Sequence, residues 1–232
     1  MDKVIIEVHF DKTCGAEAPP SHELSHIGDL YKLNVLFDKD AAKMTVTAQA
    51  TAGVTLPLVC RLWIPLQSDL SAAVISDKDL TVENLEGNII NLVSQNGNCY
   101  LKSLKSRSVN VQCSTGNIVS RSTVLGNVVF HAGKSGSITA DKLQGSSVIC
   151  ETELGAVAVK SLYADTAVMR TTGGSIHLGQ CHGQILLQGG QANVKIDSLE
   201  GDIDAGLLTG NVDVHLSRHS NSNIDIKNGK KS

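Results

Sequence analysis

The sequence contains few aromatic residues: Phe, Trp and Tyr together make up 3% of its 232 residues, and only one of them is Trp. Sites that stack nucleic acid bases or sugars are built from aromatic side chains, so this composition argues against that kind of site. Charged residues are also scarce, at 19%, and the formal net charge is −3. Without an excess of Lys and Arg, the chain is a poor candidate for binding phosphate backbones or anionic lipid. We therefore expect no nucleic acid partner.

Long hydrophobic runs are also missing. The longest apolar stretch, Val54 to Leu66, contains Arg61 and two prolines, whereas a membrane span needs about 18 uninterrupted apolar residues. The opening Met-Asp-Lys-Val has neither the basic and apolar regions of a secretory signal nor the Arg-rich character of a transit peptide. We expect no membrane insertion and an intracellular, cytoplasmic location. An organelle lumen such as the mitochondrion stays open if a longer precursor is trimmed, and the cell surface is the alternative.

The six cysteines are widely spaced, at positions 14, 60, 99, 113, 150 and 181, and they form no C-x-x-C pair. This spacing suits buried reduced thiols better than a disulfide framework or a zinc site. It favours a reducing compartment. We expect no cofactor.

Glycine, in contrast, is abundant: 21 Gly stand against 4 Pro. From about residue 70, a triplet of Gly, a polar residue and an aliphatic residue recurs, as in Gly116-Asn-Ile118, Gly126-Asn-Val128 and Gly174-Ser-Ile176. Together with variants that lack the Gly, apolar anchors follow one another about every nine to ten residues, which is too short for a helical repeat. After most anchors the pattern alternates, as in Val157-Ala-Val159, so that two apolar side chains share one face of a strand. Each unit therefore predicts one short strand and a turn.

The units pair into longer repeats. One apolar series returns every 18 to 20 residues: Leu85, Leu104, Val124, Leu143, Leu162, Cys181 and Leu199. One coil is therefore about nineteen residues long and contains two short strands. A coil cannot bury its apolar face alone, but stacked coils pair every strand with its neighbours and align Ile, Val and Leu into interior columns. We predict an all-β fold, a single-stranded parallel β-solenoid with Gly and Asn at its turns and Asn side chains stacked in a ladder.

The chain divides into three regions. Residues 1–66 lack the triplet and contain alternating runs such as Met44 to Ala50, which are typical of antiparallel strands. We expect them to form an N-terminal β cap over the first coil, because an open solenoid end exposes unpaired backbone. The β-solenoid repeat domain spans residues 67–217. Residues 218–232 form a C-terminal polar tail, in which a short strand, Ile224-Asp-Ile226, either caps the last coil or frays.

The passage at the start of the repeats resembles a known family. Arg61-Leu-Trp-Ile-Pro65 is followed by Leu70 and then by Leu80-Thr-Val-Glu-Asn-Leu85-Glu-Gly87-Asn-Ile89. This run into Gly-polar-aliphatic repeats resembles the adhesin-like β-solenoid family, which has bacterial and eukaryotic members. The resemblance covers roughly residues 58–217 and implies the solenoid fold, but no assigned reaction and no catalytic residues. Unlike typical bacterial members, this sequence shows no signal peptide or surface anchor, which favours an intracellular eukaryotic member.

One motif indicates chemistry. His22-Glu23-Leu24-Ser25-His26 spells H-E-x-x-H, which on a helix places two zinc ligands one turn apart and a Glu to activate water. However, Gly28 weakens such a helix, and Asp29 stands where the metzincin extension has Gly. We interpret the motif as a polar loop. A structural metal site and a zinc-dependent hydrolase through His22, Glu23 and His26 are the alternatives.

Two other groups of residues give weaker signals. Gly133-Lys134-Ser135 ends like a P-loop, but Val128 occupies the position of the required upstream Gly. We interpret it as a turn of the solenoid. His177 and His182 flank Cys181, yet the alternation sends His177 outward and Cys181 into the core, so we expect surface histidines and no metal site.

The last strands carry Asp202, Asp204 and Asp213, which suit a solvated face better than an acidic site. We therefore predict no catalytic, cofactor-binding or metal-binding residue, and no enzyme. The expected function is that of a non-enzymatic, adhesin-like protein-binding or scaffold module with an unknown protein partner. The alternative is a self-assembling, filament-type solenoid that associates through its ends, and the discriminating feature is whether both ends are capped.

Overall fold

A computed structural model of the protein describes residues 5–10, 31–38, 43–50, 58–75, 77–217 and 222–228. The chain divides into two compact units, Met1–Pro65 and Leu66–Ser232. All regular elements in the described residues are strands, which confirms the prediction of an all-β fold.

The first unit contains two antiparallel strand pairs. β1 (Ile5–Phe10) pairs with β4 (Leu58–Trp63), and β2 (Tyr31–Asp38) pairs with β3 (Lys43–Ala50). The antiparallel strands expected in this part of the chain are therefore present. Their role as a cap for the solenoid stays a prediction.

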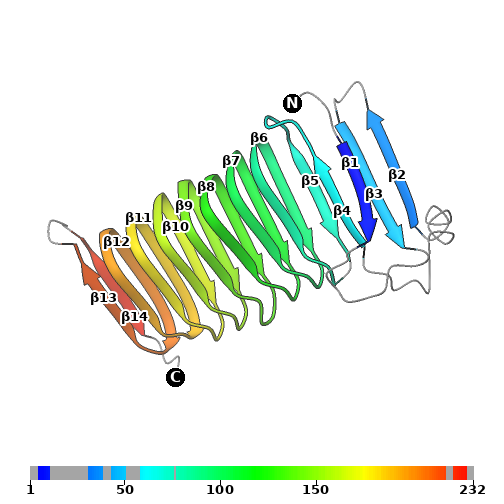
Figure 1. The fold of residues 1–232 in the computed structure, drawn as a ribbon. Coiled ribbons are helices and arrows are strands. Elements are labelled where there is room, and N and C mark those ends of the chain that lie inside the picture. The colour runs from blue at the N-terminus through cyan, green and yellow to red at the C-terminus, as the bar shows by residue number, and fades with distance from the viewer. Residues whose placement is uncertain are drawn as a thin grey trace. The chain divides into compact units, whose positions relative to one another are not determined.

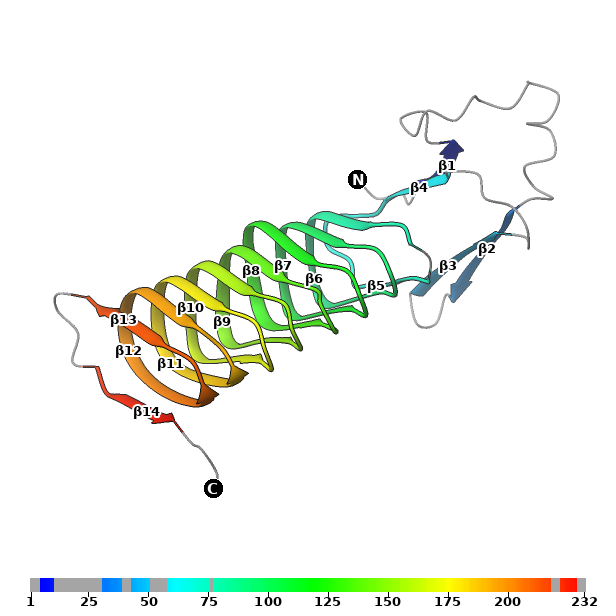
Figure 2. The same ribbon diagram turned by 90° about the horizontal axis from the view of Figure 1, so that it is seen from below.

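The second unit is a parallel β-solenoid. Its strands are β5 (Leu70–Val74), β6 (Leu80–Ser94), β7 (Cys99–Cys113), β8 (Ile118–Ala132), β9 (Ile138–Thr152), β10 (Val157–Thr171), β11 (Ile176–Gln191), β12 (Val194–Thr209), β13 (Val212–Leu216) and β14 (Ile224–Asn228). Strands β5 to β13 pair in parallel in chain order, and β14 pairs in parallel with β12. Figures 1 and 2 show the resulting stack of coils. The coils lie about 19 residues apart and make about 8 turns, which confirms the predicted fold class.

Each long strand is continuous around the coil, where the sequence predicts two short strands. It curves from one wall of the solenoid to the other (Figure 2). The strand continues because residues at the bend also pair with their counterparts, as Ala164 does with Gly145 and Gly183 with Gly201. We call the part before this bend the first arm, the part after it the second arm, and the bend itself the corner. The corner residues of successive coils are Gly87, Ser106, Gly126, Gly145, Ala164, Gly183 and Gly201.

Inward-facing side chains form continuous columns. The predicted series from Leu85 to Leu199 is one of them, since its members pair across neighbouring strands and each is at most 4% exposed. Fully burying a side chain such as Leu162 contributes about 1.5–3 kcal/mol relative to leaving it exposed. The columns therefore hold the coils together, as the repeat length predicts.

Two cysteines show how the arms face each other. Cys99 opens the first arm of β7 and Cys113 closes its second arm, and their side chains interact across the core. The start of the first arm thus faces the end of the second arm, and the middle residues of the two arms face one another. The described cysteines, all free and buried, are Cys99, Cys113, Cys150 and Cys181. Cys14 and Cys60 lie outside the residues whose side chains are described.

Polar side chains connect the turns between coils. Asp79 Oδ1 accepts the backbone N–H of Asn98 at 2.7 Å, Asn98 Oδ1 accepts that of Asn117 at 2.9 Å, and Asn117 Oδ1 accepts that of Ser137 at 2.8 Å. The Asn98 and Asn117 side-chain amides also donate along the stack. The predicted asparagine ladder is confirmed at these positions, where it satisfies backbone donors that the strands leave unpaired.

The corners come in two lengths. The corner of β10 contains one residue more than that of β11, and the corner of β9 one more than that of β8. The shorter corners contain Gly126, Gly183 and Gly201, whose φ angles are +139°, +114° and +140°. A Cβ at these positions would lie 1.8, 1.7 and 2.1 Å from a carbonyl oxygen of the preceding coil. A short corner therefore requires glycine, both for its backbone angle and for the close approach of the next coil.

Candidate functional site

The H-E-x-x-H motif, His22, Glu23 and His26, lies outside the described residues. The polar loop and the zinc site therefore both stay hypotheses. Among the residues that the structure describes, no group of three or more His, Cys, Asp or Glu side chains is arranged to hold a metal ion.

His177 and His182 do not form a common site with Cys181. Cys181 is buried in the core, whereas the two histidines interact with exposed carboxylates. His177 Nε2 lies 2.8 Å from Asp197 Oδ2, and His182 Nδ1 lies 3.7 Å from Glu200 Oε2. This is the separation that the alternation of the strand predicts.

The P-loop-like segment Gly133-Lys134-Ser135 is part of the turn between β8 and β9. The Lys134 carbonyl accepts the backbone N–H of Leu154, in the turn of the next coil, at 2.7 Å. A strand, β9, follows this turn, whereas a phosphate-binding loop is followed by a helix. The interpretation of this segment as a solenoid turn is confirmed.

The three C-terminal aspartates are on different arms. Asp202 and Asp204 lie in the part of β12 that pairs with β11 after the corner, whereas Asp213 pairs with Lys195 in the first arm. Asp202 Oδ1 accepts the backbone N–H of Asn223 at 2.9 Å, so this carboxylate stabilises a turn. These residues form no shared acidic site.

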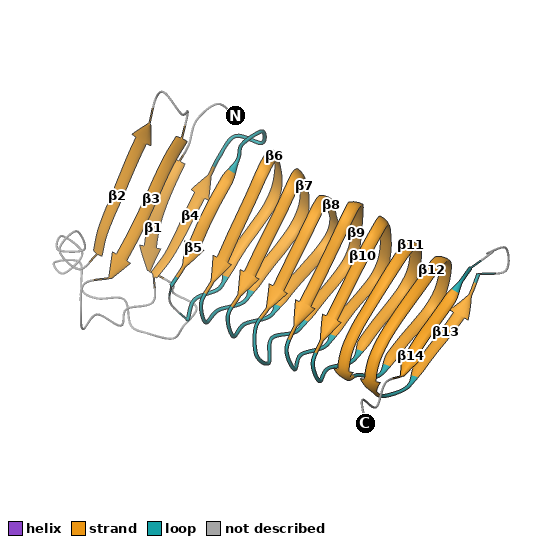
Figure 3. Cartoon of the chain, turned by 180° about the vertical axis from the view of Figure 1, so that it is seen from behind, coloured by secondary structure: helices purple, strands orange, loops and turns teal. Residues whose placement is uncertain are grey.

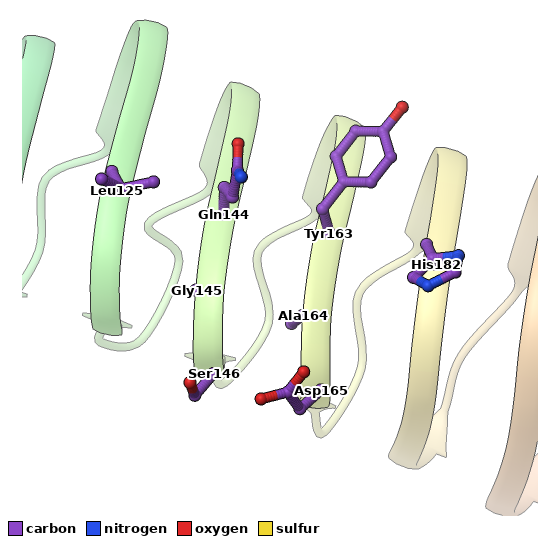
Figure 4. A pocket seen from close by; sticks show the side chains of 8 residues that line it. All are labelled: Leu125, Gln144, Gly145, Ser146, Tyr163, Ala164, Asp165 and His182. Atoms are coloured by element: carbon purple, nitrogen blue, oxygen red, sulfur yellow. The ribbon is translucent and has the colours of Figure 1, made fainter.

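A shallow pocket of about 310 Å³ lies at the corners of four successive coils, β8 to β11. Its lining residues are Leu125, Gln144, Gly145, Ser146, Tyr163, Ala164, Asp165 and His182. Figure 4 shows that Leu125, Gln144, Tyr163 and His182 form a row across neighbouring coils, while Ser146 and Asp165 lie on the opposite side of the pocket. We call this site the corner pocket.

The corner pocket follows from the local sequence. Gly145 has no side chain and Ala164 has only a methyl group, so nothing fills the space between the row and Asp165. A Cβ at Gly145 would lie 1.9 Å from a carbonyl oxygen of the preceding coil, so a larger residue would displace the backbone. Asp165 has no counterpart in β11, because the register shifts directly after Tyr163. The pocket thus forms where a longer corner is followed by a shorter one.

Tyr163 is the aromatic residue of the corner pocket, and it is 38% exposed. Its ring stacks on that of His182, with centroids 6.5 Å apart and planes at 29°. Lys142 Nζ lies 5.1 Å from the Tyr163 ring centroid, within the range of a cation–π interaction. The Tyr163 hydroxyl and Gln180 Oε1 are 3.5 Å apart. Side chains from the coils on both sides therefore hold the ring in place.

Charged residues continue the row on either side of the corner pocket. Lys105 pairs in register with Leu125, and its Nζ lies 2.6 Å from Glu86 Oε1. At the other end, Glu200 pairs in register with His182. The row therefore has apolar, amide and aromatic groups at its centre and charges at both ends, while the charged Asp165 lines the pocket on the side opposite the row.

Three of the buried cysteines are poor nucleophiles. Burial raises the pKa of Cys150 and of Cys181 to about 12. A side-chain hydrogen bond with Cys113, together with burial, also raises the pKa of Cys99. Because the thiolate is the reactive form of cysteine, these side chains stay neutral and unreactive near neutral pH.

The sequence motifs did not point to Tyr163. The signal was nevertheless present, because a nineteen-residue alignment places Tyr163 beside Gln144 and His182 at outward positions of consecutive coils. Tyrosine is also rare in this chain, which has only 3. The pocket itself depends on the unequal corner lengths, which the repeat pattern alone does not define.

No protein-family model, no curated protein and no solved structure matches this chain. Membership of the adhesin-like β-solenoid family therefore stays a prediction from the sequence. In the described part of the chain, no helix has the length and apolar character to cross a membrane.

Proposed function

We propose that the protein is a non-enzymatic binding module that holds a protein partner on the outer surface of its solenoid. The observation that carries this proposal is the corner pocket, in which a half-exposed Tyr163 is held among side chains of neighbouring coils. The proposal includes an intracellular setting, in keeping with the free cysteines of the core.

The chemistry of the corner pocket suits an anchor residue of a partner. Tyrosine is enriched among the residues that dominate binding energy, because it offers a large amphipathic surface with few rotatable bonds. The ring of Tyr163 is already positioned by Lys142 and His182, so binding costs little additional side-chain entropy. The pocket volume, about 310 Å³, lies at the lower limit of ligand sites. It suits one inserted side chain better than an enclosed substrate.

The solenoid supplies a rigid support for this surface. Tyr163 belongs to β10, which pairs in parallel with β9 on one edge and β11 on the other. Neighbouring members of the row are therefore held at the inter-strand spacing of about 4.8 Å. A partner can contact several coils at once without any rearrangement of the backbone.

The test is an affinity pull-down from a cell extract, in which the wild type and two variants are compared. Tyr163→Ala removes the ring from the corner pocket, whereas Leu154→Ala removes an apolar side chain that is 63% exposed in the turn between β9 and β10. We expect the wild type and Leu154→Ala to recover the same partner from an extract, and Tyr163→Ala to weaken that interaction about tenfold or more. Binding constants for the recovered partner then quantify the loss.

Circular dichroism of both variants is the control for folding. Equal binding by the two variants would show that the corner pocket is not the binding surface. Turnover of a substrate that depends on Asp165 or His182 would overturn the non-enzymatic part of the proposal.

A further inference from the structure

Among the described residues, none covers the core at the C-terminal end of the solenoid. Leu216, Ile224 and Ile226 are 49%, 40% and 44% exposed, although they continue columns whose preceding members are at most 3% exposed. Within the described residues, β13 and β14 pair with β12 on one edge and with nothing on the other. Figure 3 shows these two strands at the end of the stack. An unpaired edge beside exposed apolar side chains is a template for another strand.

Backbone hydrogen bonds define which groups this edge offers. The Asn211 carbonyl accepts the N–H of Val194 in β12 at 2.8 Å. Because successive residues of a strand direct their N–H and C=O groups to opposite edges, Val212, Val214 and Leu216 present theirs at the open edge.

The second arm has the same arrangement of backbone groups. The Asn223 carbonyl accepts the N–H of Ile203 in β12 at 2.9 Å, so Ile224, Ile226 and Asn228 present their backbone groups at the open edge of β14.

The outward side chains of both strands have a self-complementary charge pattern. Asp213 and His215 flank Val214, and Asp225 and Lys227 flank Ile226. If two copies of β13 pair antiparallel with Val214 opposite Val214, each Asp213 lies opposite the other copy's His215. The same pairing of β14 about Ile226 places each Asp225 opposite the other copy's Lys227. Asp225 and Lys227, which also pair within one chain at 2.8 Å, carry opposite charges, and opposite charges at facing positions stabilise strand pairs. The Asp213 carboxylate can accept a hydrogen bond from a facing His215 ring N–H.

One rotation axis serves both strands. Val214 and Ile226 occupy the middle columns of the first and second arms, and the ends of the two arms approach each other in β7, where the Cys99 and Cys113 side chains interact. A two-fold axis through Val214 and Ile226 therefore pairs β13 with β13 and β14 with β14 at the same time. In both strand pairs, the residues that present N–H and C=O groups at the open edge of one copy lie opposite the same kind of residue in the other copy.

We propose that two copies of this chain associate through their C-terminal coils, by antiparallel pairing about a two-fold axis through Val214 and Ile226. The surface is separate from the corner pocket, so the dimer leaves Tyr163 available to a partner. Two-fold pairing buries the open edge of both copies and closes the assembly at two chains.

A head-to-tail filament fits the same end less well. It would stack β14 of one copy against β5 of the next, with the columns in register. Asp225 and Lys227 would then face Ser71 and Ala73, which offer no charge. The charge pattern therefore favours the closed dimer over the open filament.

Analytical ultracentrifugation of the full chain tests the association. We expect a monomer–dimer equilibrium that Ile226→Asp abolishes, while Leu154→Asp, a matched change of an exposed apolar residue away from this end, leaves it intact. Asp225→Lys places two lysines opposite each other and weakens the dimer about tenfold. The double variant Asp225→Lys with Lys227→Asp restores it. A monomer at all concentrations, or masses that keep rising with concentration as in a filament, would overturn the proposal.

Cysteine cross-linking tests the register, in a chain where Cys14 and Cys60 are changed to serine. Facing residues of a hydrogen-bonded pair have Cα atoms about 5.5 Å apart, within reach of a disulfide. Val214→Cys is therefore expected to give a covalent dimer on mild oxidation. Val212→Cys alone is expected to give no covalent dimer, because the two Val212 positions would lie about 13 Å apart. A mixture of Val212→Cys and Leu216→Cys chains should cross-link, because Val212 of one copy lies opposite Leu216 of the other. Cross-linking of Val212→Cys to itself, or none for Val214→Cys, would contradict this register.

Discussion

The short corners allow a quantitative prediction, because a Cβ added there clashes with the preceding coil, whereas a Cβ added at Gly206 meets no atom. In Gly183→Ala, the new Cβ would lie 1.7 Å from the carbonyl oxygen of Ala164, at a backbone φ of +114°. A Cβ does not approach a carbonyl oxygen more closely than about 3 Å. The coils of β10 and β11 must therefore separate by about 1 Å at the corner. Overpacking of this size costs about 1–3 kcal/mol, and the unfavourable backbone angle adds about 1–3 kcal/mol. We expect a loss of about 3 kcal/mol or more in the free energy of unfolding.

Two matched variants isolate this effect. Gly206→Ala adds the same methyl group at a position where a Cβ meets no atom within 4 Å, and it should raise the unfolding free energy by about 0.4–1 kcal/mol. Ala164→Gly introduces glycine at the equivalent position of a longer corner, which does not require it, and should cost only about 0.5–1 kcal/mol.

The assay is urea unfolding followed by circular dichroism, with the three variants and the wild type measured together. Because solenoids unfold with limited cooperativity, the denaturant slope is compared first, and free energies are compared only where it is unchanged. Unfolding free energies of Gly183→Ala and Gly206→Ala within about 0.5 kcal/mol of each other would show that a short corner tolerates a Cβ.

Three further predictions concern the core, the turns and the thiols. Leu162→Ala should lower the unfolding free energy by about 2–5 kcal/mol in the same urea assay. The matched change at an exposed position, Leu154→Ala, should lower it by less than about 0.5 kcal/mol. Asn117→Ala interrupts the asparagine ladder and should cost about 0.5–1.5 kcal/mol, because the exposed backbone N–H of Ser137 loses its side-chain acceptor; an unchanged midpoint would show that water replaces it. Burial raises the pKa of Cys150 from 9.0 to about 12, so the folded state favours the neutral thiol, and this stabilisation is complete below pH 9 and lost as the pH rises toward 12. Between pH 8 and pH 10 the wild type should therefore lose about 1 kcal/mol more than Cys150→Ala, and equal losses would contradict burial of this thiol.

The solenoid could be predicted from sequence because its signals are strictly local and repeated. Alternation of apolar residues defines which side chains point inward, and a return every 18 to 20 residues defines the coil. The buried column from Leu85 to Leu199 and the asparagine ladder follow directly from these two periods. Cys99 and Cys181 could be assigned to the interior for the same reason.

The remaining features depend on small departures from the repeat. The extra residue before Thr166 changes the corner of β10 relative to β11, and a repeat of 18 to 20 residues does not show where the extra residue lies. The corner pocket was therefore missed. The continuity of the strands around the corner was also missed, because it results from hydrogen bonding between coils and leaves no pattern within one coil. The strand Ile224-Asp-Ile226 was predicted in the tail and is present as part of β14, which pairs with β12. Its alternation alone does not show which edge of β13 and β14 stays unpaired.

Photo-cross-linking of the full chain to the partner recovered by the wild type tests directly whether the corner pocket is the binding surface. p-Benzoylphenylalanine is placed either at Gln144, in the row beside Tyr163, or at Arg170, an exposed residue on the second arm of the same group of coils. The proposed binding surface predicts a cross-link from Gln144 that disappears when Tyr163→Ala is added, and none from Arg170. A cross-link from Arg170 and not from Gln144, or one from Gln144 that persists without the Tyr163 ring, would contradict the claim that the corner pocket binds the partner.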